Sequence, residues 1–174
     1  AKYHITTFCA PPTMYRMLIK QDLSQYDLSS IQHATTAGEA LNPEVFYQFR
    51  KATGLQIAEG YGQTEMTLGI GNLTGNLMKP GSMGKPIPGY GIDLVDPDGN
   101  PVADGVNGEI CIKTSGDHLP CGLFLGYYQD EERTKAVWHD GWYHTGDLAW
   151  RDEDGFYWYV CLLYTSDAAD EARS

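Results

Sequence analysis

The stretch that decides the fold is QHATTAGEALNPEVFYQFRKATGLQIAEGYGQTE, residues 32–65. Its first residues, Gln32 to Thr36, predict a short strand that opens into Ala37-Gly38-Glu39. Residues 43–53 predict a helix, and Gln56 to Glu59 predict the next strand. Strand, helix and strand in this order are typical of an α/β layer with parallel pairing.

The capping residues predict where this helix begins and ends. Asn42 is a good N-cap, Pro43 fits the first helical position, and Glu44 suits the positive end of the helix dipole. Gly54 supplies the C-terminal stop. The predicted core stripe consists of Val45, Phe46, Phe49 and Ala52.

The alternation continues towards the N-terminus and changes in the second half. His4 to Ala10 predicts a buried strand, and Met14, Met17 and Leu18 at helical spacing predict a helix over Thr13–Lys20. Helices are scarce beyond residue 90 apart from Asp130–Val137. The strands predicted there are Ile92–Val95, Gly108–Lys113 and Tyr157–Val160, with turn chemistry at Asp96-Pro97-Asp98-Gly99 and Asp152-Glu153-Asp154-Gly155.

Two parts of one domain are therefore expected. Residues 1–70 form an α/β part, and residues 71–160 form a small β-rich subdomain. The stretch Gly71–Gly84 is rich in glycine and poor in large apolar residues, which favours a connection between the two parts.

The composition restricts the class of partner. The chain has 12 Lys and Arg against 23 Asp and Glu, a net charge of −11, which argues against nucleic acid or an anionic membrane as the main partner. Its four cysteines, Cys9, Cys111, Cys121 and Cys161, show no zinc-ligand spacing and no disulfide framework, which favours a reducing compartment. No apolar run approaches membrane-spanning length. These features predict a soluble, cytoplasmic protein without a membrane span.

Three clusters carry groups suited to chemistry. The first is Thr35 to Leu41, a strand end that turns through Gly38. The second is Glu59-Gly60-Tyr61-Gly62-Gln63-Thr64-Glu65, in which glycines flank an aromatic ring and a hydroxyl and a carboxylate follow. The third is Trp142 to Asp147, whose carboxylate follows a tight turn. Tyr61 offers a flat face to a base, Thr64 a hydroxyl to a phosphate, and Glu65 an oxygen ligand to Mg²⁺.

Each cluster alone also has a plain structural interpretation. Tyr61 would then be a core residue, Glu65 a solvated carboxylate, and the Thr-Gly-Asp run an ordinary turn. For His144, a packed and hydrogen-bonded histidine is favoured over a catalytic base, and for Lys85 a turn residue is favoured over a catalytic lysine. The chain contains neither GxSxG nor a Walker phosphate loop, so hydrolase and P-loop functions lose support.

In combination the clusters resemble a known family. The ordered motifs GEAL, EGYGQTE, PGSMGKPIPGY, GEICI and GYYQDEERTKAVWHDGWYHTGD are similar to those of the adenylate-forming (AMP-binding) superfamily, and the resemblance covers nearly all of residues 1–160. The residues of EGYGQTE, of TTFCAPPTMYR and of the run from Lys135 to Val160 look most like those of the medium-chain acyl-CoA synthetase branch. The resemblance implies the C-terminal part of the large N-terminal domain of such an enzyme, with its lid domain absent.

The resemblance also implies roles for individual residues. Gly38, Glu39 and Ala40 would line the adenine pocket. Tyr61 would stack on the adenine ring, in a wall shaped by Glu59, Gly60, Gly62 and Gln63. Thr64 would bind the α-phosphate and Glu65 would hold Mg²⁺, which makes these two the expected catalytic residues. Asp147 would bind the ribose hydroxyls.

The implied reaction is the ATP-dependent activation of a carboxylic acid, expected to be a fatty acid, to an acyl-adenylate and then to acyl-CoA, with ATP, Mg²⁺ and coenzyme A. The alternatives are an aryl-acid or amino-acid adenylating ligase and a nucleotide-binding pseudoenzyme. A β-rich ligand-binding module is disfavoured by the order of the clusters.

The sequence departs from the family at both ends. The phosphate-binding loop with its lysine would lie upstream of residue 1, and the Gly-Arg pair, hinge Asp and lid lysine expected after Val160 are replaced by Cys161-Leu162-Leu163. The chain by itself is therefore expected to be inactive. Residues 161–171 match the in-frame translation of a transposon-end adapter of sequencing libraries, so residues 161–174 are predicted to be a non-native tail.

Overall fold

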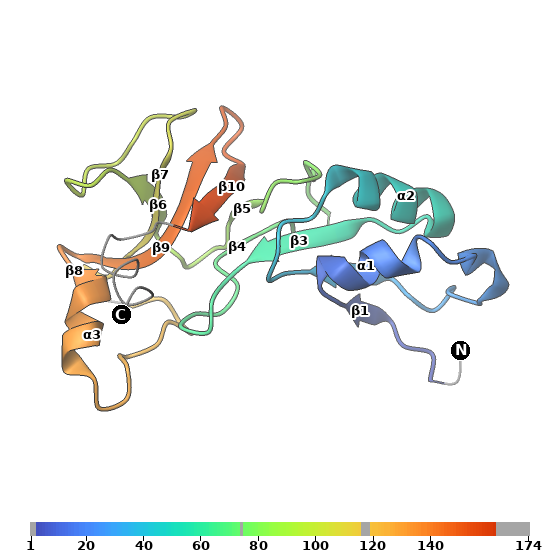
Figure 1. Cartoon of the computed structure of the whole chain (residues 1–174), viewed down its shortest axis with the longest axis horizontal. Helices are drawn as coiled ribbons and strands as arrows, with labels where there is room; N and C mark the ends of the chain where they lie inside the picture. Colours follow the sequence, from blue (N-terminus) through green and yellow to red (C-terminus); the bar gives the residue numbers. More distant parts are fainter. Residues whose placement is uncertain (1–2, 74, 116–118, 163–174) are drawn as a thin grey trace, which may run out of the picture. The chain divides into compact units, whose positions relative to one another are not determined.

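The computed structural model in Figure 1 describes residues 3–73, 75–115 and 119–162. The chain divides into two compact units, Ala1–Ile87 and Pro88–Ser174. Within the described residues, the first unit combines a mixed sheet with helices, and the second is dominated by an antiparallel sheet. The predicted α/β class with a β-rich second part is confirmed.

The first unit is built on a sheet whose strands follow the order β1-β2-β3-β4-β5. β1, β2 and β3 are parallel, with Thr7 opposite His33 and Thr36 opposite Glu59, whereas β4 and β5 are antiparallel to their neighbours. The bounds are β1 (Thr7–Cys9), β2 (His33–Thr36), β3 (Ile57–Tyr61), β4 (Ile70–Gly71) and β5 (Lys85–Pro86). Lys85, expected in a turn, therefore lies in a short strand.

Helix α2 (Pro43–Thr53) has the predicted caps. The Asn42 side chain accepts a hydrogen bond from the Glu44 backbone N–H at 2.8 Å, and Gly54 adopts φ +75° at the C-terminal end. Val45, Phe46 and Phe49 are buried as predicted, but the prediction for Ala52 is wrong because this residue is exposed. The buried stripe of α2 therefore ends at Phe49.

Helix α1 (Pro12–Leu18) buries a different face from the one that its methionines suggest. Tyr15 is completely buried, with its ring edge-on to Phe49 at 5.0 Å and its hydroxyl donating to the Thr35 carbonyl at 3.0 Å. Met14 and Met17 are exposed. The buried ring of Tyr15 therefore anchors α1. The next element along the chain is the 3₁₀ turn η1 (Leu23–Gln25). The core cluster is Ala10, Tyr15, Leu23, Ala34, Leu41, Val45, Phe46, Phe49 and Ile57.

The boundary between the units lies later than the expected one after residue 70. The predicted connection Gly71–Gly84 is tied back to β3, since the Asn72 backbone N–H donates to the Glu59 carbonyl at 2.9 Å. The Asn72 side chain also donates to the Ser82 carbonyl at 2.9 Å. β4 and β5 therefore extend the first sheet, and the division falls between Ile87 and Pro88.

The second unit holds an antiparallel sheet in the order β10-β9-β7-β6, with β8 paired to β9. β6 and β7 have the predicted bounds, and the central strand β9 is a ten-residue strand that the sequence had suggested only as a turn. The buried apolar residues of this sheet include Leu94, Ile110, Ile112, Tyr143 and Tyr157. The elements are β6 (Ile92–Val95), β7 (Gly108–Lys113), α3 (Glu131–Val137), β8 (Trp138–His139), β9 (Trp142–Arg151) and β10 (Tyr157–Leu162).

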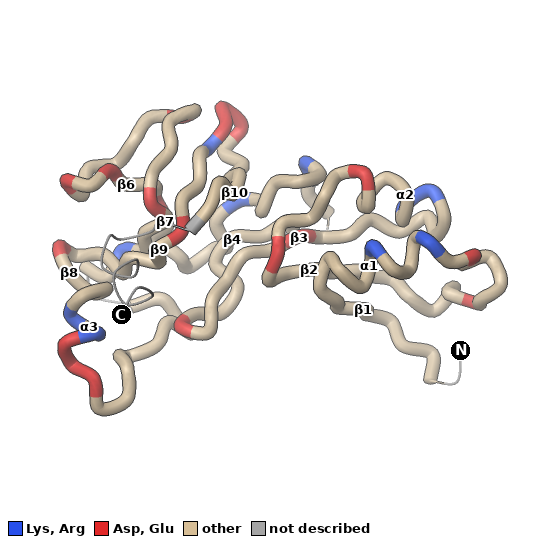
Figure 2. The backbone as a smooth tube through the Cα atoms, viewed as in Figure 1, with Lys and Arg blue, Asp and Glu red and all other residues tan. Residues whose placement is uncertain are grey.

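The predicted tail touches the described residues only at its start. Cys161 and Leu162 continue β10 opposite Leu148 and Asp147, and residues 163–174 lie outside the described part. Acidic residues are scattered over both units with basic residues between them (Figure 2). In the described part of the chain, none of the helices has the length and apolarity needed to cross a bilayer.

Candidate functional site

Two of the motif segments follow the same edge of the first sheet. β2 ends at Thr36 and leads into Gly38–Ala40, while β3 ends at Tyr61 and leads into residues 62–65. The strands are parallel, so their carboxyl ends meet at one edge, where open α/β sheets bind their ligands. Gly38 has φ +90°, a conformation that lets the chain turn directly after β2. The fold thus brings the first two predicted clusters together.

Glu59 connects these segments. Its carboxylate oxygen Oε1 accepts a hydrogen bond from the Leu41 backbone N–H at 3.0 Å, which holds the residues after Gly38 against β3. The residue is only 5% exposed, and Oε2 is buried without a hydrogen-bond partner in the structure. Burial raises the pKa of Glu59 to about 7, an effect that the Leu41 N–H partly opposes. The carboxyl group is therefore placed where a further donor would be stabilising.

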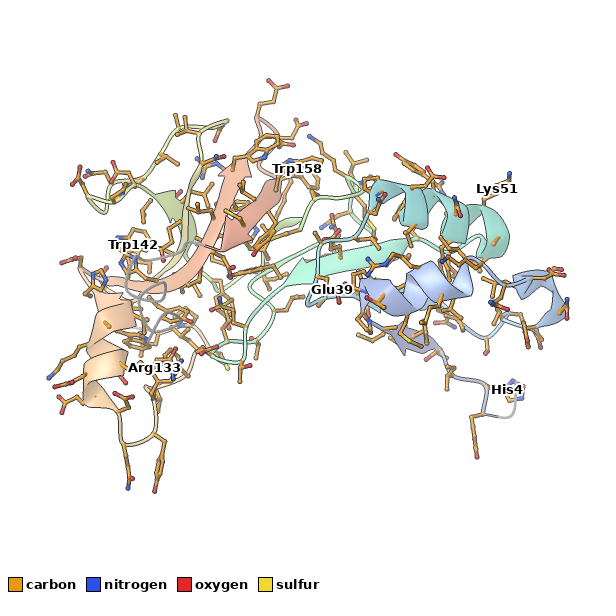
Figure 3. The ribbon with its side chains drawn as sticks, viewed as in Figure 1. His4, Glu39, Lys51, Arg133, Trp142 and Trp158 are labelled. Atoms are coloured by element: carbon orange, nitrogen blue, oxygen red, sulfur yellow. The ribbon has the colours of Figure 1, made fainter. Side chains whose placement is uncertain are left out.

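Side chains of α1 hold Glu39, which follows Gly38 after β2. Its carboxylate accepts the Thr13 hydroxyl at 3.1 Å and pairs with the Arg16 guanidinium at 3.3 Å. Figure 3 shows Glu39 next to α1. Both partners of the ion pair are about half exposed, so the pair contributes little to stability and mainly orients the segment. Thr13 and Arg16 were not predicted, because no sequence spacing links α1 to a segment that follows β2.

The glycine-rich cluster forms the end of β3 and the turn after it. Gly60 and Tyr61 pair with Gly71 and Ile70 of β4. A Cβ atom on Gly62 would lie 2.8 Å from the Thr67 carbonyl oxygen, so the chain can pass there only without a side chain. Beyond this close approach, Gln63 and Glu65 are half-buried and Thr64 is exposed.

Asp147 belongs to the second unit and lies in a β-bulge. Glu109 of β7 faces Leu148 of β9, and Cys111 faces His144, so three residues of β9 oppose the single residue Ile110. These three are the Thr-Gly-Asp run, residues 145–147. The predicted turn is therefore a bulge inside a strand, a feature that often re-aims a side chain beside an active site.

The bulge is held by its own side chains and by β7. The Thr145 hydroxyl donates to the Ile110 carbonyl at 2.7 Å and accepts from the Asp147 N–H at 3.2 Å. Asp147 is 4% exposed, and the Tyr159 hydroxyl donates to its Oδ1 at 3.2 Å. A ribose hydroxyl that donated to Asp147 Oδ1 would either share this oxygen with the Tyr159 hydroxyl or displace the Tyr159 hydroxyl from it. Tyr159 was not among the predicted site residues, because its distance from Asp147 depends on the β9–β10 register.

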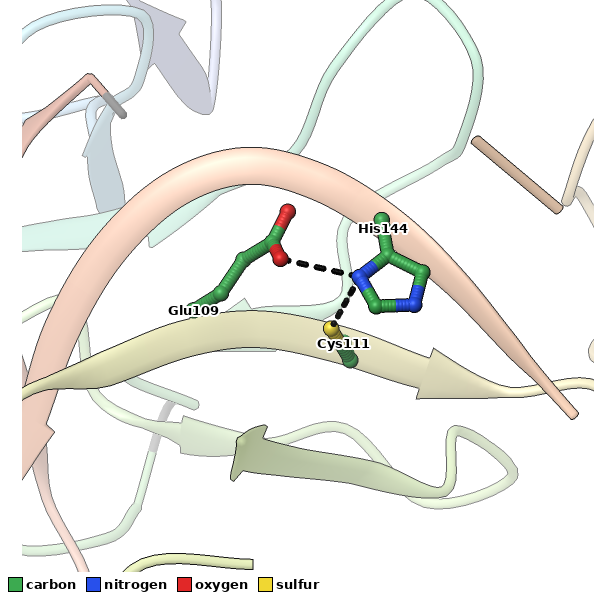
Figure 4. Close-up of side chains that lie close together, drawn as sticks. All are labelled: Glu109, Cys111 and His144. Carbon is green, nitrogen blue, oxygen red and sulfur yellow. Dashed lines mark hydrogen bonds and ion pairs between the residues drawn. The ribbon is translucent and has the colours of Figure 1, made fainter. Parts of the chain in front are cut away.

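The second unit also contains a cluster of Glu109, Cys111 and His144, shown in Figure 4, whose ligand-type atoms lie within 4.8 Å of one another. His144 Nδ1 is 2.8 Å from Glu109 Oε2 and 3.4 Å from Cys111 Sγ, and its ring stacks on His139 at 4.0 Å. The prediction of a packed, hydrogen-bonded His144 is confirmed.

This cluster has the geometry of hydrogen bonds. Two ligand atoms on tetrahedral zinc lie about 3.4 Å apart, since each is about 2.1 Å from the ion. The 2.8 Å between Nδ1 and Oε2 is shorter and is typical of a charge-assisted hydrogen bond. Burial and the neighbouring Glu109 carboxylate raise the pKa of the Cys111 thiol, which keeps it protonated. Sequence spacing could not reveal the cluster because two strands contribute to it.

Comparisons with known proteins agree with these motifs. The AMP-binding enzyme family matches residues 1–128. The rat protein acyl-coenzyme A synthetase ACSM3, mitochondrial, is 44% identical over 160 residues, and human acyl-coenzyme A synthetase ACSM4, mitochondrial, is 43% identical over 158 residues. These matches cover 92% and 91% of this chain but 27% of either relative, so the chain spans about a quarter of their length.

Solved structures show the same fold. The anthranilate CoA ligase AuaEII, in complex with anthranoyl-AMP, superposes with a TM-score of 0.83 at 34% identity, covering 92% of this chain and 30% of that one. A benzoate CoA ligase from Burkholderia xenovorans LB400 gives a TM-score of 0.79 at 30% identity, with coverage of 92% and 32%.

The predicted cytoplasmic location is contradicted, because the similar acyl-coenzyme A synthetases of rat and human are mitochondrial proteins. Free cysteines indicate a reducing environment, and they do not separate these two compartments. From the ordered motifs, the fold and the match over residues 1–128, the chain belongs to the AMP-binding enzyme family, in which it is similar to the medium-chain acyl-CoA synthetases.

Proposed function

We propose that the protein to which this chain belongs activates a carboxylic acid with ATP, forming an acyl-adenylate, and then transfers the acyl group to coenzyme A. The observation that carries this proposal is the arrangement of residues at one edge of the first sheet. There, Glu59 ties the segment after β2 to β3, beside the Tyr61–Glu65 turn. The similarity to acyl-coenzyme A synthetases supports the same reaction.

The proposed residue roles follow the chemistry of the groups. Tyr61 stacks on adenine in a pocket lined by Gly38, Glu39 and Ala40, with Glu59, Gly60, Gly62 and Gln63 shaping its wall. The Thr64 hydroxyl donates to an α-phosphate oxygen, and Asp147 accepts hydrogen bonds from the ribose hydroxyls. In the reaction, a carboxylate oxygen bonds to the α-phosphorus as pyrophosphate leaves. The thiolate sulfur of coenzyme A then bonds to the acyl carbon as AMP leaves.

Mg²⁺ fits the residues of the Tyr61–Glu65 turn. Glu65 and Thr64 offer the hard oxygen donors that this ion prefers, and the close approach at Gly62 keeps the turn free of a bulky side chain. When bound, the ion supplies neutralisation of the charge that develops on the phosphates. Glu65 would hold it, while Thr64 orients the α-phosphate.

The test is carboxylate-dependent exchange of labelled pyrophosphate into ATP, measured with the complete protein encoded by the source gene. Medium-chain fatty acids should support exchange and, with coenzyme A, should yield thioester. The alternative is an aryl-acid ligase, which the similarity to the anthranilate and benzoate CoA ligases favours. Exchange with benzoate or anthranilate and none with fatty acids would establish that alternative. Nucleotide binding with no exchange for any acid would instead indicate a pseudoenzyme.

A further inference from the structure

We propose that Glu109 is a positioning residue, which fixes the direction of the Asp147 carboxylate by holding the bulge of β9 with both of its own oxygens. This inference rests on the proposed function, in which Asp147 binds the ribose of ATP. Glu109 lies on β7 and need not touch the nucleotide. Its side chain is 16% exposed, so its charge is largely withdrawn from water.

Both carboxylate oxygens of Glu109 are engaged by the segment that precedes Asp147. Oε1 accepts the Gly146 backbone N–H at 2.8 Å, and Oε2 lies 2.8 Å from His144 Nδ1. The bulge takes the Gly146 N–H out of the regular β7–β9 ladder, in which Ile110 is the single residue opposite the bulge. Gly146 is partly buried, and an N–H that is held from water without an acceptor would be costly, so Glu109 replaces the missing ladder partner.

We call the two contacts of Glu109, with the Gly146 N–H and with His144 Nδ1, the clamp. The tautomer of His144 decides whether Nδ1 can donate to Glu109. Its Nε2 atom is buried and has no hydrogen-bond partner in the structure. A proton on Nδ1 gives Glu109 a donor and leaves only a lone pair at Nε2, whereas the other neutral tautomer would bury an unpaired N–H. The stacked ring of His139 packs against the imidazole at 4.0 Å. The geometry therefore assigns the Nδ1–H tautomer, with Glu109 as a carboxylate.

The clamp acts on Asp147 through one peptide link. Gly146 has φ +73°, and the next N–H, that of Asp147, is held by the Thr145 hydroxyl. Releasing the Gly146 N–H would free the bulge to rotate about these bonds. The Asp147 side chain would then be less well fixed in direction while keeping its charge, although the Thr145 and Tyr159 hydroxyls still hold Asp147. The expected consequence is weaker recognition of the ribose, with little effect on the acid substrate.

Glu109→Gln tests this directly, because the amide keeps the size of the side chain but can accept only one of the two hydrogen bonds. In the present chain, NMR should show the Nδ1–H tautomer of His144 in the wild type and its loss in the variant. Exchange protection of the Gly146 amide should fall at least tenfold, while the amide of Ile112 in β7 stays protected. His144→Ala removes only one of the two bonds and should act more weakly in the same direction.

In the complete protein, Glu109→Gln should raise the KM for ATP about tenfold and leave the KM for the acid and for 2′,3′-dideoxy-ATP unchanged. The matched control is Asp93→Asn. Asp93 is a half-buried carboxylate of the same sheet, lies opposite Cys111 and bonds to Arg151 at 3.1 Å. Asp93→Asn should change the KM for ATP and the KM for 2′,3′-dideoxy-ATP by the same factor, even where it lowers stability.

Asp147→Ala separates the two proposals. If it weakens ATP and spares the dideoxy analogue, Asp147 reads the ribose. An unchanged Gly146 amide in Glu109→Gln, or equal losses for both nucleotides, then overturns the positioning role alone. If Asp147→Ala affects both nucleotides equally, the ribose assignment itself is wrong, and the role of Glu109 in ribose recognition is refuted with it.

Discussion

Replacing Glu59 by Gln should make the first unit more stable at neutral pH and remove most of its pH dependence. Glu59 is buried, and the pKa of its carboxyl group is raised from 4.5 to about 7. The folded unit therefore binds this proton more tightly than the unfolded chain does. The stabilisation by the protonated group is fully present below pH 4.5 and is lost as the pH rises through about 7. Glutamine keeps an oxygen that can accept the Leu41 N–H, and it carries no charge.

The magnitude follows from the size of the shift. A difference of 2.5 pKa units, from 4.5 to about 7, corresponds to roughly 3 kcal/mol. Between pH 5 and pH 8 the wild-type unit should lose about 2–3 kcal/mol of its free energy of unfolding through this one group. Glu59→Gln should lose none of that amount, and its curve should cross the wild-type curve on the acidic side of pH 7.

Amide exchange in helix α2 measures this quantity within the first unit, because α2 contributes buried residues to that core. The free energy of opening is compared at pH 5 and pH 8 for wild type, Glu59→Gln and the control Glu44→Gln. Glu44 is an exposed carboxylate at the start of the same helix. A wild-type difference that persists in Glu59→Gln, or that vanishes in Glu44→Gln, would refute the reasoning.

Three further changes have defined outcomes. In the complete protein, Glu65→Gln should lower adenylate formation about a hundredfold or more and raise the Mg²⁺ requirement, as measured by pyrophosphate exchange, since an amide cannot neutralise the ion. Gly84→Ala should cost well over 2 kcal/mol in urea unfolding, because its Cβ would overlap the backbone of Gly71. The control Gly75→Ala, at φ +88° in open space, should cost only about 1–2 kcal/mol. Re-sequencing the source locus past codon 160 should give Gly-Arg and a downstream Asp, and recovery of codons for Cys161 and Leu162 from genomic DNA would refute the predicted adapter tail.

The features that could be predicted from the sequence are those that a few neighbouring residues determine. The caps of α2 at Asn42 and Gly54 lie within the helix ends that they define, so the borders follow from a few neighbouring residues. The strands on either side of the Asp96–Gly99 turn were predicted with their observed bounds for the same reason. The motif order identified the family because it needs no knowledge of packing.

The features that sequence reasoning missed depend on register and on contacts over long distances. Met14 and Met17 have helical spacing, but the ring of Tyr15 packs against Phe8 of β1 and Phe49 of α2 instead. A Thr-Gly-Asp run looks the same in a turn and in a bulge. Only the pairing of β9 with β7 decides between them, and the same pairing brings Glu109 to His144.

The bulge also limits how the length of β9 can change. Tyr143, Asp147 and Ala149 point their side chains to the buried side, and the bulge places two extra residues between the flanking pairs with β7. Side chains alternate between the two faces of a strand, so an even insertion preserves that alternation and an odd one inverts it. Deleting one residue between Tyr143 and Ala149 would turn apolar side chains outward along the rest of the strand, whereas deleting two would abolish the bulge and spare the core. Length variation at this position should therefore occur in steps of two.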